Sequence, residues 1–270
     1  MQKHLAFYYF LKTDKANFDT KYYAFPNTLT PLSIHQNVET EIENYSTSVF
    51  GSENKNYLAL IQGMRTQPLF VNLRGKIDKI TVVFKPLGLN HFVKKSFARI
   101  CPKDSQIFTE WNENEDYQKF LRKFYATENQ AERIKFLEEY LLKIYHPIEN
   151  EELLQRTITL LTDFENEKNV EEIAEELGLN VRTFNRIFKE NLGISPIGFK
   201  KIARFRHSLN NGFFNEQFKR LTDIAYNSNF YDQSYFINIY KQMTGSNPKI
   251  FFDKVEKVGA DKLLFQFLNK

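Results

Sequence analysis

An internal repeat near the C-terminal end of the chain constrains its fold more than any other feature. The stretch IAEELGLNVRTFNRIFKENLGISP, residues 173–196, is followed by IAYNSNFYDQSYFINIYKQMTGSNP, residues 224–248. An Ile-Ala pair opens each copy, Phe184 aligns with Phe236, and a Gly-x-x-Pro sequence closes each copy. Because a repeat of this length is usually one supersecondary unit that packs against its neighbour, we expect two similar helical units.

Each copy has the layout of two helices joined by a tight turn. Gly178 provides the turn in the first copy, and Asn229 takes its place in the second, where asparagine tolerates left-handed backbone geometry. Gly193 and Gly245 are typical of helix C-caps, which need a positive φ. A Ser-Pro pair and an Asn-Pro pair then follow, as expected for an N-cap before a proline at the first helical position. These signals predict a helix-turn-helix in each copy.

The second helix of each copy starts on polar residues. In a helix-turn-helix protein this helix lies in the DNA major groove, and its N-terminal residues reach base edges. Arginine can make a bidentate contact with guanine, and asparagine or glutamine with adenine. Asp232 precedes the second of these helices and is expected to be its N-cap. We predict base-reading roles for Arg182, Thr183, Asn185, Arg186, Gln233, Ser234, Tyr235 and Asn238.

The distribution of charge is more informative than the net charge of +4. Residues 163–176 are acidic and residues 182–206 are basic, which indicates a face for a polyanion beside a solvated scaffold. A charged pair of surface helices would produce the same pattern. Contacts to DNA phosphates are expected from Lys189, Lys200, Lys201, Arg204, Arg206, Lys241 and Lys249. Arg204 and Arg206 have an alternative role, in which they pair with the acidic residues and hold the two subdomains together.

Three stretches carry a family resemblance: IAEELGLN, RTFNRIFKENLGISPIGFKKIARFRHSL and IAYNSNFYDQSYFINIYKQMTGSNPKIFF. Through them, residues 153–255 resemble the DNA-binding domain of AraC-type bacterial transcription regulators. The resemblance implies a monomeric all-helical unit in which the helix 196–211 joins two helix-turn-helix subdomains. The second motif departs from the family, since Asn238 stands where members usually carry arginine. We therefore expect the second motif to read DNA less tightly than the first.

The N-terminal half has a different pattern. Residues 1–110 are rich in β-branched and aromatic residues punctuated by Gly, Pro and Asn, which predicts strands. From about Glu113 apolar residues recur at helical spacing, and Pro147 ends the last of these helices. The segments AFPNTLTPLSIHQNV and LIQGMRTQPLFVNLRGKIDKITVVFKPLGLNHFV resemble an uncharacterised sensor-type domain found ahead of some AraC-type DNA-binding domains. That resemblance implies a β-rich, cupin-like domain that binds an effector or mediates dimerisation.

The predicted fold class is α+β. A β-rich, sensor-like domain that ends in helices is expected over residues 1–147, and an all-α domain with two helix-turn-helix motifs over residues 151–256. A short C-terminal tail is expected over residues 257–270. The helix predicted at residues 130–145 has two interpretations, either a contact between copies of the chain or plain core packing.

Composition limits the other functions. Cys101 is the only cysteine, so an internal disulfide is excluded and a reducing compartment is favoured. No apolar stretch reaches the ~20 residues that a membrane span needs, which predicts a cytoplasmic protein with no membrane partner. The five histidines are scattered without metal-ligand spacing and are interpreted as core or surface residues. We expect no metal, no cofactor and no enzymatic activity.

Together these features predict a sequence-specific DNA-binding transcription regulator. Its expected partners are double-stranded DNA and, as further candidates, RNA polymerase, a small-molecule effector and a second copy of the chain. Tandem helix pairs also build bundles that bind no DNA, so alternatives remain. One is a small-molecule sensor or protein-interaction module with a degenerate DNA-binding domain. Another is an enzyme in the N-terminal half.

Overall fold

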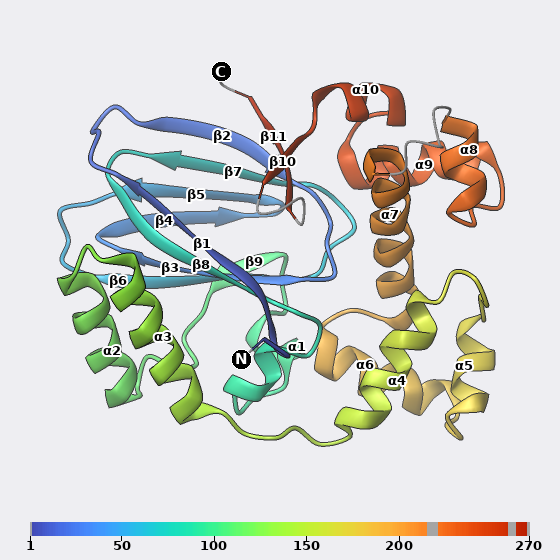
Figure 1. The fold of residues 1–270 in the computed structure, drawn as a ribbon, viewed down its shortest axis with the longest axis horizontal. Helices are drawn as coiled ribbons and strands as arrows, with labels where there is room; N and C mark the ends of the chain where they lie inside the picture. Colours follow the sequence, from blue (N-terminus) through green and yellow to red (C-terminus); the bar gives the residue numbers. More distant parts are fainter. Residues whose placement is uncertain (1, 215–220, 259–262, 269–270) are drawn as a thin grey trace. The chain divides into compact units, whose positions relative to one another are not determined.

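The computed structural model describes residues 2–214, 221–258 and 263–268. The chain divides into two compact units, which are described separately below (Figure 1). Unit 1 comprises Met1–Asp19, Leu29–Gly63 and Asn72–Glu149, and unit 2 comprises Thr20–Thr28, Met64–Val71 and Asn150–Lys270. The strands belong mainly to the N-terminal half and the C-terminal half is mostly helical, so the predicted α+β class is confirmed.

An antiparallel sheet forms the centre of unit 1. Its strands lie in the order β1-β8-β3-β6-β9. Their bounds are β1 Leu5–Thr13, β8 Ile77–Phe84, β3 Thr30–Gln36, β6 Tyr57–Gln62 and β9 Ser105–Ile107. Strand β8 pairs with β1 on one side and with β3 on the other, where Ile80 lies opposite Ile34. A hairpin of β4 (Val38–Glu43) and β5 (Ser46–Gly51) also belongs to this unit.

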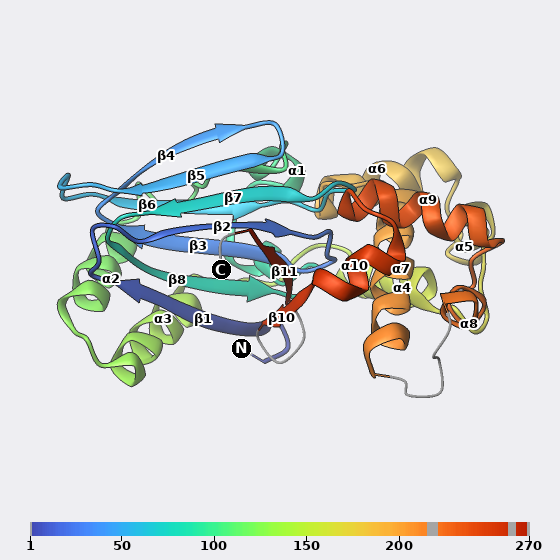
Figure 2. The same ribbon diagram turned by 90° about the horizontal axis from the view of Figure 1, so that it is seen from above.

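Two helices cover one face of this sheet. Helices α2 (Glu115–Ala126) and α3 (Gln130–Ile144) lie side by side in both views (Figures 1 and 2). Their apolar stripes, with Phe124 and Leu137, pack against Ile34, Ile80 and Val82 of the sheet. The stripe of α3 is therefore used in core packing. Two short helices, η1 (Leu89–Phe92) and α1 (Phe97–Ile100), complete the helical part of the unit.

Unit 2 contains β10, β11, most of β2 and the first residues of β7, which lie in the order β10-β11-β2-β7. Their bounds are β10 Glu256–Val258, β11 Leu263–Phe267, β2 Asp19–Ala24 and β7 Leu69–Arg74. Residues 257–270, predicted to be a tail, thus include a strand, because β11 pairs with β2 and its Phe265 packs on Tyr22. Residues 259–262 and 269–270 of that segment lie outside the described residues.

Helices form the larger part of unit 2. They are α4 Glu151–Thr162, α5 Val170–Glu176, α6 Val181–Leu192, α7 Pro196–Phe214, α8 Leu221–Asn227, α9 Gln233–Thr244 and α10 Pro248–Lys254. Figure 1 shows α7 between two groups of helices, with α4–α6 at one end and α8–α10 at the other. Side chains of α7 such as Phe205 share one core with Phe236 and Tyr240 of α9. In the described part of the chain, no helix has the length and apolar character needed to cross a membrane.

Candidate nucleic-acid interface

The first helix-turn-helix consists of α5 and α6. Asn169 and Glu172 form a capping box at the start of α5, and buried Ala174 allows a close approach to α6. The turn places Gly178 at φ +68°, a region that glycine enters without a steric penalty. Asn180 then caps α6, since its side chain accepts a hydrogen bond from the Thr183 amide at 2.9 Å.

Burial of the apolar stripe of α6 leaves its polar start accessible. Phe184, Phe188 and Leu192 are buried, whereas Arg182 and Arg186 are exposed. Thr183 and Asn185 are half-buried, and the Asn185 amide donates to the Val181 carbonyl at 2.8 Å. Arg186 pairs with Glu190 one turn later at 3.2 Å. That exposed pair contributes little stability, so the guanidinium can exchange it for another acceptor.

The second helix-turn-helix consists of α8 and α9. Asn229 lies at φ +54°, which confirms that asparagine takes the left-handed turn position that Gly178 occupies in the first motif. Asp232 is the N-cap of α9, as predicted, and accepts from the Tyr235 amide at 2.7 Å. Gly193 and Gly245 end their helices at φ +74° and +75°, so both predicted C-caps are confirmed.

The four predicted base-reading residues of α9 are all exposed. They are Gln233, Ser234, Tyr235 and Asn238. Phe236, Ile239 and Tyr240 on the opposite side of the helix are buried in the core. Both motifs therefore present exposed polar residues at the start of the second helix, but α9 exposes all four of its predicted readers and α6 exposes only Arg182 and Arg186.

The predicted phosphate-contacting residues separate into two groups. Lys189, Lys241 and Lys249 are exposed. Half-buried Lys201 donates to the Gln242 side chain at 2.9 Å, which joins α7 to α9. Lys201 also lines a groove of about 360 Å³ with Lys200, Arg204, Ile197 of α7, Tyr235 of α9 and the first residues of α5. This groove places basic α7 side chains beside the start of the second recognition helix.

The other group has partners inside the protein. Lys200 is 9% exposed, and its Nζ lies 2.9 Å from Glu167 Oε1. Arg204 forms an ion pair with the same carboxylate and packs over the Phe164 ring. Arg206 is half-buried, and burial lowers its pKa to about 10. Of the two roles considered for Arg204, pairing with the acidic segment is the one that its geometry supports.

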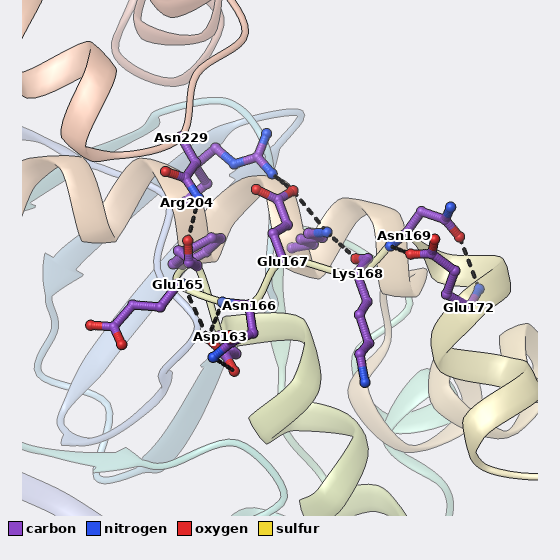
Figure 3. Close-up of polar contacts among 11 residues, drawn as sticks. Asp163, Glu165, Asn166, Glu167, Lys168, Asn169, Glu172, Arg204 and Asn229 are labelled. Carbon is purple, nitrogen blue, oxygen red and sulfur yellow. Dashed lines mark hydrogen bonds and ion pairs between the residues drawn. The ribbon is translucent and has the colours of Figure 1, made fainter.

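The loop between α4 and α5, residues 163–169, carries most of these partners. Asp163 caps its own loop by accepting from the Glu165 and Asn166 amides at 3.0 and 2.9 Å, and these bonds lower the pKa of the Asp163 carboxyl, the Asn166 amide most. The Asn229 side chain donates to the Phe164 carbonyl (Figure 3). One loop thus contacts α7 through Glu167 and the turn of the second motif through Phe164. We name it the tether loop.

Sequence reasoning offered pairing of Arg204 and Arg206 with the acidic segment as one of two roles, but it identified neither Glu167 as the partner nor the contact of this loop with Asn229. The acidic run was visible, but nothing local distinguished Glu167 from the other carboxylates, and Asn229 was identified only for its turn geometry. Histidines also come together unexpectedly in unit 1, where the rings of His4 and His91 have centroids 4.1 Å apart. Within the described residues no group of three or more His, Cys, Asp or Glu side chains is arranged to hold a metal ion.

Comparison with known proteins identifies the helical motifs. Residues 173–254 match a family described as a helix-turn-helix domain. Among solved structures, the chain is similar to ToxT from Vibrio cholerae at 15% sequence identity and a TM-score of 0.48, covering 92% of this chain and 97% of that chain. A structure of wild-type ToxT with bound unsaturated fatty acid gives 16% identity and a TM-score of 0.46, with coverage of 93% and 96%. No curated protein matches the chain.

The family match runs from within α5 to the end of α10 and so includes both recognition helices. Residues 173–254 are therefore a helix-turn-helix DNA-binding domain, and the AraC-type resemblance predicted for this part of the chain is confirmed. The family that this domain matches is a family of transcription regulators, not a family of enzymes.

Proposed function

We propose that this protein is a transcription regulator that recognises a specific DNA sequence with the N-terminal residues of α6 and α9. The observation that carries the proposal is the pair of capped recognition helices with exposed polar starts, at Arg182 and Arg186 in one and at Gln233 and Asn238 in the other. Helices of this kind place their first residues against base edges in the major groove.

Phosphate contacts would come first from the exposed lysines Lys189, Lys241 and Lys249, with Lys201 at the edge of the groove. Such contacts supply affinity that is independent of sequence and falls with salt. Lys200, Arg204 and Arg206 would first have to leave their internal environment. Arg182 and Arg186 would supply most of the base discrimination, since α9 has uncharged Asn238 one turn into the helix.

The remaining parts of the proposal concern the rest of the chain. We propose that residues 1–147 respond to a small-molecule effector and that residues 151–256 bind DNA. The protein would act in the cytoplasm on double-stranded DNA, with RNA polymerase as its target, either alone or as a homodimer. No enzymatic activity is assigned to it.

Gel-shift titration of the full chain on genomic fragments flanking its own gene tests the proposal. We expect a discrete complex that survives excess random competitor DNA and weakens steeply with salt. The control fragment is a coding segment of equal length from elsewhere. Equal affinity for both fragments, or no complex at low salt, would contradict sequence-specific regulation and favour a degenerate DNA-binding domain.

A further inference from the structure

Two segments from the N-terminal half of the sequence belong to unit 2. They are Thr20–Thr28 and Met64–Val71, and the residues before and after each of them belong to unit 1. Each segment is therefore joined to unit 1 by the chain at both of its ends. The two segments are also joined to each other, since Arg65 donates to the Ala24 carbonyl at 3.0 Å. We call them the inserted segments.

The inserted segments complete the core of the second helix-turn-helix. Phe25 is 5% exposed and belongs to the same apolar cluster as Phe236 of α9. Its ring meets that of Phe251 in α10 edge to face, with centroids 4.9 Å apart, and Phe251 meets Tyr240 of α9 at 5.7 Å. Met64 of the other inserted segment is partly buried against the same cluster. The buried face of α9 therefore packs partly on residues from the N-terminal half of the sequence.

A polar contact joins an inserted segment to the exposed side of α9 as well. The Gln242 amide donates a long hydrogen bond to the Thr66 hydroxyl at 3.4 Å and accepts one from Lys201 of α7 at 2.9 Å. Lys201 lines the groove that also contains Tyr235, a predicted base-reading residue at the start of α9. The inserted segments thus contact α9 through its buried face and through an exposed side chain.

Packing of the first helix-turn-helix uses residues that are close together in the sequence. The Phe188 ring of α6 meets that of Phe199 in α7 at 5.4 Å, and Phe184 lies beside Phe188. Helix α9, the counterpart of α6 in the second copy of the repeat, shares its core with Phe25. The two copies therefore differ in which part of the chain supports their recognition helix.

The ring of Phe25 matters for the position of α9 as well as for its burial. Removal of a buried phenylalanine destabilises the surrounding structure through lost apolar contact and through the cavity that remains. Helix α9 has only 12 residues, so its stability depends more on the packing of its apolar face than on its own helix propensity. Gln233 and Asn238 can reach base edges only if this packing holds the helix in place.

We propose that Phe25 is a positioning residue for the second recognition helix, and that α9 reads bases only while the inserted segments occupy the core of unit 2. The first recognition helix, α6, reads its bases without them. The N-terminal half thereby determines whether the protein recognises one element of a binding site or two. This inference rests on the proposed function, but the support that Phe25 gives to α9 is a property of the free protein and can be measured without DNA.

Hydrogen exchange of the full chain tests the positioning role without DNA. In Phe25→Ala the amides of α9 are expected to exchange about tenfold faster than in the wild type, whereas those of α6 keep their rates. Phe25→Leu keeps an apolar side chain in the core and should give an intermediate rate in α9. It also serves as the test variant if Phe25→Ala fails to fold. The matched control is Phe97→Ala, which removes a ring of 3% exposure from the core of unit 1 and should leave α9 unchanged.

Gel shifts then measure what each recognition helix reads. The probes are the fragment bound in the titration above and two versions of it, each with one of the two recognition elements randomised. The element read by α6 is the one whose randomisation no longer matters in Arg186→Ala. Each randomised version should bind the wild-type protein about tenfold more weakly or worse. Phe25→Ala should still discriminate at the element of α6 and should no longer discriminate at the element of α9, while Phe25→Leu recovers part of the latter.

Faster exchange in α6 and α9 alike would make Phe25 a general core residue and would overturn the inference. Unchanged exchange in α9 would overturn it too, as would discrimination lost at both DNA elements or at neither. A failure of the regulator proposal has a different signature. In that case no fragment is bound specifically, while Phe25→Ala still accelerates exchange in α9 alone.

Discussion

Arg186 is the residue with the strongest expected effect on sequence recognition. It is exposed on α6 and held only by an exposed pair with Glu190. We expect Arg186→Ala to cost roughly 1–3 kcal/mol at the specific site and to relax base choice at one position. Competition gel shifts with single-base variants of the binding site measure both effects. Equal weakening on specific and random DNA would identify Arg186 as a phosphate contact.

Lys189 and Lys200 form a matched pair for phosphate contacts. Both are lysines of the DNA-binding unit, but Lys189 is exposed while Lys200 is 9% exposed and paired with Glu167. Lys189→Ala should therefore reduce the slope of log K against log salt by about one unit, and Lys200→Ala should leave it unchanged. Salt titration of DNA binding compares the two variants. The opposite result would mean that Lys200 leaves Glu167 when DNA binds.

The contrast between Lys189 and Lys200 shows how much of a single residue's role can be predicted from the sequence. The base-reading residues could be predicted because their exposure follows from helix periodicity and from caps such as Asp232 and Gly245, all of which are local signals. Whether a lysine meets solvent or an internal carboxylate depends on which distant segment packs beside it. For Lys200 that segment is the tether loop, and no spacing rule connects the two.

At the scale of elements, the tether loop is the feature with the clearest energetic consequence. Glu167 neutralises Lys200 and Arg204, whose side chains are 11% and 16% exposed. Glu167→Gln keeps the shape of the side chain but leaves two partly buried cations without a counter-ion. We expect a loss of roughly 1–3 kcal/mol in the free energy of unfolding.

Urea unfolding of the full chain measures that loss. The control is Glu175→Gln, which removes an exposed carboxylate from α5 in the same acidic run and should have little effect. If Glu167→Gln matches this control, the ion pairs contribute nothing to stability.

The elements themselves were predictable to different degrees. The helices of the C-terminal half have polar outer faces, so their apolar stripes stand out in the sequence. Strands such as β3 and β8 are buried on both faces, and only the character of the buried side chains differs between the faces. A strand like TPLSIHQ therefore lacks the exposed positions that would mark its alternation, and its buried Ser33 and His35 could be assigned to one face only once the pairing of β3 with β8 was known.

For the whole molecule, the buried histidines predict how stability responds to acid. Burial lowers the pKa of both His35 and His207 from 6.5. The unfolded chain therefore binds protons at these residues more readily than the folded chain does, so unfolding becomes easier as pH falls. Their contribution to stability is complete above about pH 6.5 and decreases below it, toward the lowered folded pKa values.

Urea midpoints between pH 7.0 and 5.5 check this prediction. We expect the wild-type protein to lose stability over this range and His35→Gln to lose less, since only His207 of the two then remains. Lys79 lies opposite His35 and has a pKa of about 8, so it stays mostly protonated over this range and adds little to the slope. Identical pH slopes for the two proteins would contradict the assignment to His35.

The hydrogen bond from Asn229 to the Phe164 carbonyl has a consequence for the DNA that this protein can use. It joins the turn of the second motif to the loop ahead of the first, while α7 packs into the core with α9. One extra base pair between the two contacted grooves rotates the second by about 34°, since a helical turn takes about 10–10.5 base pairs. Two recognition helices joined in this way have little freedom to follow that rotation of the second groove. Promoters served by this protein should therefore keep the interval between their two recognition elements constant, even where the bases within that interval differ.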